Sequence, residues 1–402
     1  MIVSDDPASP VRVARHAFHY ACVFAVAFAL FRVQEIATTY ISEYPTHVQI
    51  ARELIAPNPF GFAVPHPGFH WLTLALGKLA HIRLEDAGVL VLASFVVAIA
   101  VVNNQALRKA HQGLCSEREI LWQGVAMLLV SAVFFPPVSQ NFYLGQGTAN
   151  FWATPTLVVV RPFAVASVLL LVALFDKANK SARPRTALWL SVCLLLSVVM
   201  KPSFLIVFAP VAAVYAACKW RQIDRRLFLL GVLACLPCVL LLVYQYYTSF
   251  RVTPDSAQSA LYHDSVQLTW FGVWRGFSSN ILGSILLGVA FPLALSLCRL
   301  RSLLRNDYLL ISWGIWFVGF LQFAFVAETQ RFAHGNFSWG YNLALSLLFV
   351  FCTAEWVRWV KETPAVRGLQ KVALGGVSAL FALHLVSGVV YLLWQLQGKI
   401  YY

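Results

Sequence analysis

A short polar segment after the first apolar stretch contains two side chains able to transfer a proton, Glu43 and His47. Pro45 lies between them and favours the first turn of a helix, because its nitrogen carries no hydrogen and its φ angle is already helical. Apolar residues then recur at helical spacing, which predicts a short amphipathic surface helix over 45–55. The helix dipole favours an ionised carboxylate at Glu43, which suits a general base with His47 as its partner. The alternative is that both are ordinary polar residues of a surface helix.

Two further histidines, His66 and His70, follow in the same polar region. Together with Glu43 and His47 they offer the nitrogen and oxygen ligands that a divalent metal accepts. The pattern lacks the further acidic ligands of a typical metal site. We therefore expect no metal and no other cofactor, and a divalent metal is the alternative.

Amide, hydroxyl and aromatic side chains interleave over 139–156. Amides and hydroxyls can hydrogen-bond the hydroxyl groups of a sugar, and aromatic rings can stack on its faces. Two glycines in the segment permit tight turns or close approach of the backbone. This composition indicates a sugar-binding segment, and the alternative is an aromatic loop at a membrane surface.

Two cationic residues are associated with apolar stretches. Arg161 lies inside one of them, where an arginine costs about 2.5–3.5 kcal/mol on insertion scales. That cost indicates a partner for the guanidinium group, although a side chain that reaches the membrane surface would also be tolerated. Lys201 lies between two short apolar stretches and precedes a proline.

A second polar cluster begins at Glu328 and Arg331. These two residues are three positions apart, and the simpler interpretation is a surface ion pair of little energetic value. His334 and Asn336 follow, and Asn336 also fits a glycosylation sequon, a match that is near chance for a single site.

The composition indicates the environment of these side chains. Of the 402 residues, 59% are hydrophobic and 12% are charged, whereas soluble domains are about 45–50% apolar and about 25% charged. The sequence therefore predicts a polytopic membrane protein. The net charge of +13 would suit a nucleic-acid partner, but membrane proteins collect Lys and Arg in their cytoplasmic loops. We expect no nucleic-acid partner, and we expect the first apolar stretch to be retained as a span.

Apolar stretches of about 20 residues predict helical membrane spans. About eleven such stretches indicate an all-α bundle that forms a single transmembrane domain over 1–402. The predicted spans are 15–33, 87–104, 120–136, 156–175, 187–200, 203–218, 227–246, 279–297, 308–326, 340–356 and 372–396.

Short basic loops alternate with longer polar loops between these spans. By the positive-inside rule the basic loops are cytoplasmic, which places the N-terminus inside. The segment 69–82 is apolar enough for a span, but counting it would invert the basic loops that follow, so we expect it to be interfacial or re-entrant. The outer face then carries the Lys201 corner and the loops 34–86, 137–155, 247–278 and 327–339.

A carboxylate and several cations on one face suit transfer from a phosphate-bearing donor. The base takes a proton from the attacking hydroxyl while Arg or Lys stabilises the leaving phosphate. In this arrangement the chain resembles the type C superfamily of integral membrane glycosyltransferases, which use polyprenyl-phosphate-linked sugars on the extracytoplasmic face. The resemblance rests on topology over the whole chain and on an acidic residue in the first outer loop, here Glu43 or Glu35. Members often carry Asp or Asp-Glu where this chain has Glu43-Tyr44.

The resemblance implies a role for each candidate residue. Glu43 would be the general base on an acceptor hydroxyl, assisted by His47. The lipid phosphate would contact Arg161, Lys201 and Arg331. The sugar or the acceptor would contact His66, His70, Asn141, Tyr143, Gln146, Asn150, Trp152, Glu328, His334 and Asn336.

The implied partners are a polyprenyl-phosphate-linked sugar donor, a glycan or lipid-linked acceptor, and membrane lipids. The implied location is a bacterial inner membrane, with the site facing the periplasm and serving cell-envelope polysaccharide biosynthesis. Surface-polysaccharide polymerases and ligases share large outer loops with Arg and His, and remain an alternative. A transporter or flippase of lipid-linked sugars would line its route with Arg161 and Lys201, but the sequence has no inverted repeat and no intramembrane acid for a coupling ion.

Overall fold

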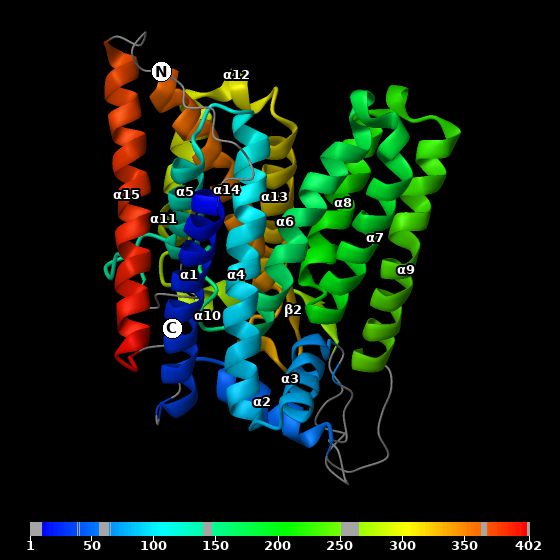
Figure 1. Cartoon of the computed structure of the whole chain (residues 1–402), viewed down its shortest axis with the longest axis vertical. Coiled ribbons are helices and arrows are strands. Elements are labelled where there is room, and N and C mark those ends of the chain that lie inside the picture. The colour runs from blue at the N-terminus through cyan, green and yellow to red at the C-terminus, as the bar shows by residue number, and fades with distance from the viewer. Residues whose placement is uncertain are drawn as a thin grey trace.

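A computed structural model describes residues 10–37, 39, 41–55, 64, 66–139, 147–250, 265–362 and 368–399. Within these residues the protein is a bundle of helices that run along one common axis (Figure 1). Nine of the described helices are long and apolar enough to cross a membrane. The chain is therefore a polytopic, predominantly α-helical membrane protein, as its composition predicts.

Nine long helices make up the bundle: α1 (Pro10–Ile36), α4 (Leu84–His111), α6 (Pro155–Phe175), α7 (Arg183–Met200), α9 (Arg225–Phe250), α11 (Ile281–Cys298), α13 (Asp307–Phe325), α14 (Ser338–Glu362) and α15 (Leu369–Leu396). The shorter helices are α2 (Tyr44–Glu53), α3 (Gly68–Ala80), α5 (Glu117–Leu129), α8 (Ser203–Cys218), α10 (Gly272–Phe277) and α12 (Leu300–Leu303). Three short 3-10 helices lie within the described residues: η1 (Lys177–Ala182), η2 (Trp220–Gln222) and η4 (Phe332–His334).

Two short strands interrupt the helical architecture. Strand β1 (Val266–Leu268) pairs antiparallel with β2 (Val326–Glu328), and Val266 lies opposite Glu328. The predicted all-α class still describes the bundle, and this small sheet is a feature that the sequence did not predict. Its effect is to fix the backbone just before Arg331.

Two of the eleven expected spans differ from the structure. The segment 203–218 forms α8, whose 16 residues extend about 24 Å, less than the hydrocarbon core of about 30 Å. The segment 120–136 is helical only as far as Leu129, where α5 ends. Val130 is already extended, and Pro136 disfavours the helical conformation only at Phe135, the residue before it.

The chain after α5 continues as an extended segment inside the bundle. Its backbone groups bond to neighbouring helices, because Ser131 N donates to the His384 carbonyl at 3.3 Å and Val133 N donates to the Leu287 carbonyl at 3.1 Å. Non-helical backbone at membrane depth is stable only when such groups are satisfied inside the protein. Gly388 of α15 permits the close approach, since a Cβ atom there would lie 1.4 Å from the Leu129 carbonyl oxygen.

The two ends of the bundle differ. One end carries α2 and α3, and the other carries α12 (Figure 1). We name them the outer end and the basic end, after the predicted outer loop and the basic loops that they contain. The segment 69–82, expected to be interfacial or re-entrant, forms most of the 13-residue α3 at the outer end.

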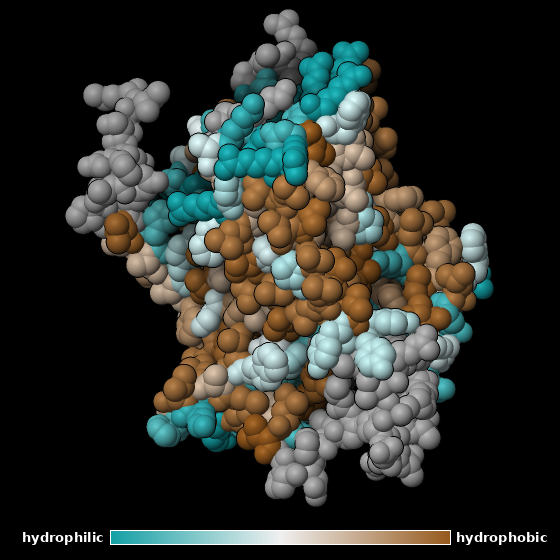
Figure 2. All heavy atoms as spheres, turned by 90° about the vertical axis from the view of Figure 1, so that its right-hand side faces the viewer, coloured by the Kyte–Doolittle hydropathy of each residue, from teal (hydrophilic) through white to brown (hydrophobic). Residues whose placement is uncertain are grey.

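Apolar side chains cover the middle of the molecule. Figure 2 shows a broad hydrophobic surface on the side of α9, with hydrophilic side chains nearer the ends. On α9 the large apolar residues Phe228, Leu233 and Leu240 are all exposed. By contrast, α6 and α14 are mostly buried. This distribution suits a bundle whose periphery faces lipid and whose centre consists of α6 and α14.

Candidate functional site

Glu43 lies immediately before α2, as the proline-based prediction expected. Its backbone N–H donates to the Ala153 carbonyl at 2.9 Å, which joins the first polar loop to the segment 147–155. The next residue, Tyr44, is fully buried and its hydroxyl donates to the Glu85 carbonyl at the start of α4. The start of α2 is therefore held on two sides, which fixes the backbone at Glu43. The predicted helix over 45–55 corresponds to α2 (Tyr44–Glu53).

Glu43, His47 and His70 form a continuous chain of titratable groups. Glu43 Oε2 lies 3.7 Å from His47 Nε2, one helical turn away, and His47 Nδ1 lies 3.0 Å from His70 Nε2 on α3. His70 is only 1% exposed. Burial, and then the neighbouring His47, lower the pKa of His70 to about 3, against a smaller opposing effect of the Pro67 carbonyl. His70 is therefore a neutral hydrogen-bond partner of His47.

Lys201 occupies the corner between α7 and α8 and is 7% exposed. Its ammonium group donates to Thr156 Oγ1 at 2.8 Å and lies 4.9 Å from the centre of the Trp339 ring. Burial lowers the pKa of Lys201 to about 8, while the negative charge of Glu43 acts in the opposite direction. Lys201 thus remains mainly protonated at neutral pH and lies within electrostatic range of Glu43.

His66 completes this group. Burial lowers the pKa of His66 well below its usual value, and the nearby positive charge of Lys201 lowers it further, followed by His47, His70 and Arg331. Its Nδ1 atom is buried without a hydrogen-bond partner in the described part of the chain. We call this group the outer cluster and define it as Glu43, His47, His66, His70, Lys201 and Arg331.

Arg331 is positioned by a buried carboxylate. Glu328, at the end of β2, is 7% exposed and accepts a hydrogen bond from Arg331 at 3.2 Å. Glu328 also accepts a hydrogen bond from the side-chain amide of Asn336. The pair is thus more buried than the surface ion pair considered from sequence. His334 is exposed on η4, and its backbone N–H donates to the Arg331 carbonyl at 3.0 Å. Its imidazole ring has no contact with the outer cluster among the described residues.

Arg161 has the partner that its burial requires. The side chain is 2% exposed, its guanidinium group donates to the Ala149 carbonyl, and it lies 4.2 Å from the centre of the Phe151 ring. These contacts hold the segment that provides the Ala153 carbonyl to Glu43. Arg161 is buried against protein groups, and its described contacts position the backbone beside the outer cluster.

Asn150 and Trp152 are also buried, at 1% and 3% exposed. Asn150 Nδ2 donates to Ser131 Oγ at 3.1 Å, and Trp152 Nε1 donates to the Leu128 carbonyl at 3.2 Å. These bonds attach the segment 147–155 to α5 and to the extended chain after it. Three other candidate sugar-binding residues lie outside the described residues: Asn141, Tyr143 and Gln146.

Sequence reasoning missed two residues of the site, Thr156 and Trp339. Both contact Lys201, and each lies at the edge of a segment that the sequence analysis had singled out. The sequence marked these two residues only as part of segments rich in aromatic and hydroxyl side chains. That composition did not indicate that either residue would contact Lys201. Across the described residues, no group of three or more His, Cys, Asp or Glu side chains is arranged to hold a metal ion.

Comparisons with known proteins do not assign the chain to a family. No protein-family model matches it, and a search of the curated proteins finds no match. The geometry of the site is therefore the basis on which a function can be inferred.

Proposed function

We propose that this protein is an integral membrane glycosyltransferase that moves a sugar from a polyprenyl-phosphate-type lipid donor to an acceptor hydroxyl. The observation that supports the proposal is the position of Glu43, 3.7 Å from His47 and within electrostatic range of the buried ammonium group of Lys201. A proton acceptor beside a cation is what transfer from a phosphate-bearing donor requires. The two groups come from parts of the chain that are far apart in sequence.

Each group has a role in the proposed reaction. The acceptor oxygen attacks the anomeric carbon of the sugar, and its proton passes to the Glu43 carboxylate. The bond between the anomeric carbon and the phosphate oxygen breaks, and the phosphate leaves with the bonding electron pair. Lys201 and Arg331 stabilise the charge that develops on this phosphate, because preorganised cations in a water-poor site act strongly on a developing anion.

The remaining groups position these two functions. His47 bonds to neutral His70 and is thereby oriented toward Glu43. Thr156 and Trp339 fix the ammonium group of Lys201. Arg161 fixes the segment 147–155, whose Ala153 carbonyl holds the backbone of Glu43. We propose that the outer end faces the periplasm of a bacterial inner membrane, because the basic loops lie at the opposite end.

The proposal is tested in cells that lack the protein, by mass spectrometry of their surface glycans and lipid-linked sugars. Such cells are complemented with wild type, with Lys201→Gln, or with Lys371→Gln, which removes an exposed lysine at the other end of the bundle. We expect wild type and Lys371→Gln to restore a missing sugar unit, and Lys201→Gln to leave unused polyprenyl-phosphate donor. Identical glycans and lipid-linked sugars with and without the protein would refute a transferase function.

A further inference from the structure

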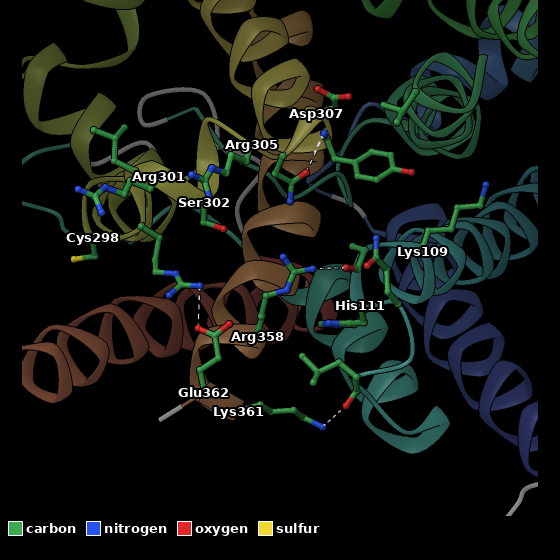
Figure 3. Close-up of a pocket in the computed structure, with 18 of the residues that line it drawn as sticks. Lys109, His111, Cys298, Arg301, Ser302, Arg305, Asp307, Arg358, Lys361 and Glu362 are labelled. Carbon is green, nitrogen blue, oxygen red and sulfur yellow. Dashed lines mark hydrogen bonds and ion pairs between the residues drawn. The ribbon is translucent and has the colours of Figure 1, made fainter. Parts of the chain in front are cut away.

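A large cavity of about 1480 Å³, drawn in close-up in Figure 3, is lined by residues of the basic end. Figure 1 places α12, which lines it, at the end of the bundle opposite α2 and α3. The ends of α4, α11, α13 and α14 surround it, together with α12. Its volume exceeds the range of about 300–1,000 Å³ that is usual for a small-molecule site. The proposed transferase reaction makes no use of this cavity.

Cationic side chains from three separate parts of the chain line the cavity. They are Lys109, Arg299, Arg301, Arg305, Arg358 and Lys361. Only two acidic residues, Asp307 and Glu362, line it among the residues that the structure describes. The positive-inside rule explains why cations occur in these loops, but it does not require them to surround one hollow.

Some of these cations belong to the framework of the bundle. Glu355, with a side chain only 1% exposed, bridges Arg299 at 3.1 Å and Arg358 at 3.3 Å. Arg299 also contacts Glu362 at 3.0 Å, and Lys361 contacts Glu119 at 2.9 Å. These pairs tie α14 to its neighbours and shape the cavity wall.

Three other cations that line the cavity form no such ion pairs among the described residues. Lys109, Arg301 and Arg305 have no acidic partner within the described chain, and all three are exposed. Figure 3 shows Arg301 and Arg305 on one side of the cavity and Lys109 on the other. His111 lies near Lys109, is buried, and has an Nδ1 atom with no hydrogen-bond partner in the described residues. The cavity thus offers positive charge to an anion through these three side chains.

Part of the cavity rim is apolar. Leu297 and Leu300 line it and are 69% and 52% exposed, at the end of the candidate span α11. An anion that binds here therefore has an apolar surface beside it, at the end of a candidate span. Basic pockets between membrane helices on the cytoplasmic side are suited to the headgroups of anionic lipids.

We propose that this cavity binds the phosphate-bearing headgroup of an anionic phospholipid from the cytoplasmic leaflet. Arg301 and Arg305 contact the phosphate from one wall and Lys109 from the other. The acyl chains leave along Leu297 and Leu300. A soluble phosphate compound carries the same negative charge, but it has no acyl chain that could contact the apolar rim.

The test is native mass spectrometry of the full-length protein with added phosphatidylglycerol, cardiolipin, phosphatidylcholine or soluble pyrophosphate. The cavity variant is Arg301→Gln with Arg305→Gln. Its matched control is Arg221→Gln with Arg225→Gln, which removes two exposed arginines that do not line the cavity. We expect anionic lipid to bind wild type and the control equally, and the cavity variant about tenfold more weakly, since each basic residue near an anionic surface contributes severalfold in affinity.

Lys109→Gln tests the opposite wall of the cavity and leaves α12 unchanged. It therefore tests the proposal even if the double variant at Arg301 and Arg305 fails to fold. Its affinity for phosphatidylglycerol should fall severalfold. Equal losses in the control and cavity variants would show diffuse attraction and overturn the proposal. Binding of pyrophosphate, but not of anionic lipid, through Arg301 and Arg305 would also overturn it in favour of a soluble ligand.

Discussion

His47 Nδ1 lies 3.0 Å from His70 Nε2, so two imidazole rings join α2 to α3 beside the carboxylate of Glu43. One ring must donate and the other accept, because a hydrogen bond between two imidazoles needs one proton. Since burial keeps His70 neutral, its hydrogen bond sets the orientation of His47. This hydrogen bond orients the His47 ring so that its second nitrogen, Nε2, faces the carboxylate of Glu43.

Replacing His70 tests this positioning role. In His70→Ala the His47 ring loses its partner, and we expect the transfer rate to fall about 10-fold, less than the roughly 10²–10⁴-fold loss for a general base. His81→Ala is the control, because His81 is exposed at the end of α3. The measurement is sugar transfer in membranes that contain equal amounts of each protein. A loss in His81→Ala as large as that in His70→Ala would contradict the positioning role.

The pH dependence of activity should reflect Lys201. Its pKa is lowered to about 8 by burial, so the ammonium form is lost as the pH rises through 8. We expect activity to fall about tenfold per pH unit above that value, since only the protonated form stabilises the phosphate. Lys201→Arg keeps its charge to much higher pH. If the variant retains activity, its alkaline decline should disappear, and an unchanged decline would show that another group titrates.

Arg161→Gln should destabilise the protein as well as slow it. The change leaves the Ala149 carbonyl without its charged donor and removes the contact with Phe151. Loss of such a buried hydrogen bond costs about 1–3 kcal/mol. We expect a lower melting temperature than for wild type or for the exposed-site control Arg185→Gln. A normal melting temperature combined with complete loss of donor binding would mean that Arg161 acts on the lipid phosphate instead.

Gly388→Ala tests the close contact between α15 and the end of α5. Its new Cβ atom would lie 1.4 Å from the Leu129 carbonyl oxygen, so the two segments must separate. Overpacking of this kind typically costs about 1–3 kcal/mol. The control is Gly375→Ala on the same helix, where no atom lies within 4 Å of the new Cβ. Thermal unfolding in detergent should separate the two variants, and equal melting temperatures would contradict the packing described for α5.

The local parts of the structure could be predicted from the sequence. Pro45 and the helical spacing after it identified α2, and the expense of a buried arginine predicted a partner for Arg161. Long apolar stretches identified the nine long helices. Each of these features depends on neighbouring residues or on the cost of placing one side chain in an apolar environment.

The remaining features depend on contacts between distant segments. Hydropathy does not distinguish an apolar helix from an apolar extended segment, so the end of α5 at Leu129 was not predicted. The contacts of Lys201 with Thr156 and Trp339 join three parts of the chain, and no periodicity reports them. Similarly, Asn150 and Trp152 have a composition typical of sugar binding, but their donors bond to protein groups.

The most direct test of the proposed function is the effect of Glu43→Gln. Cells that lack the protein would be complemented with wild type, Glu43→Gln, or Glu53→Gln, which alters a glutamate at the other end of α2. Surface glycans and lipid-linked sugars would be compared by mass spectrometry at equal membrane abundance. We predict that wild type and Glu53→Gln restore the glycan, while Glu43→Gln does not and accumulates the polyprenyl-phosphate donor. Full restoration by Glu43→Gln would contradict a catalytic role for this carboxylate.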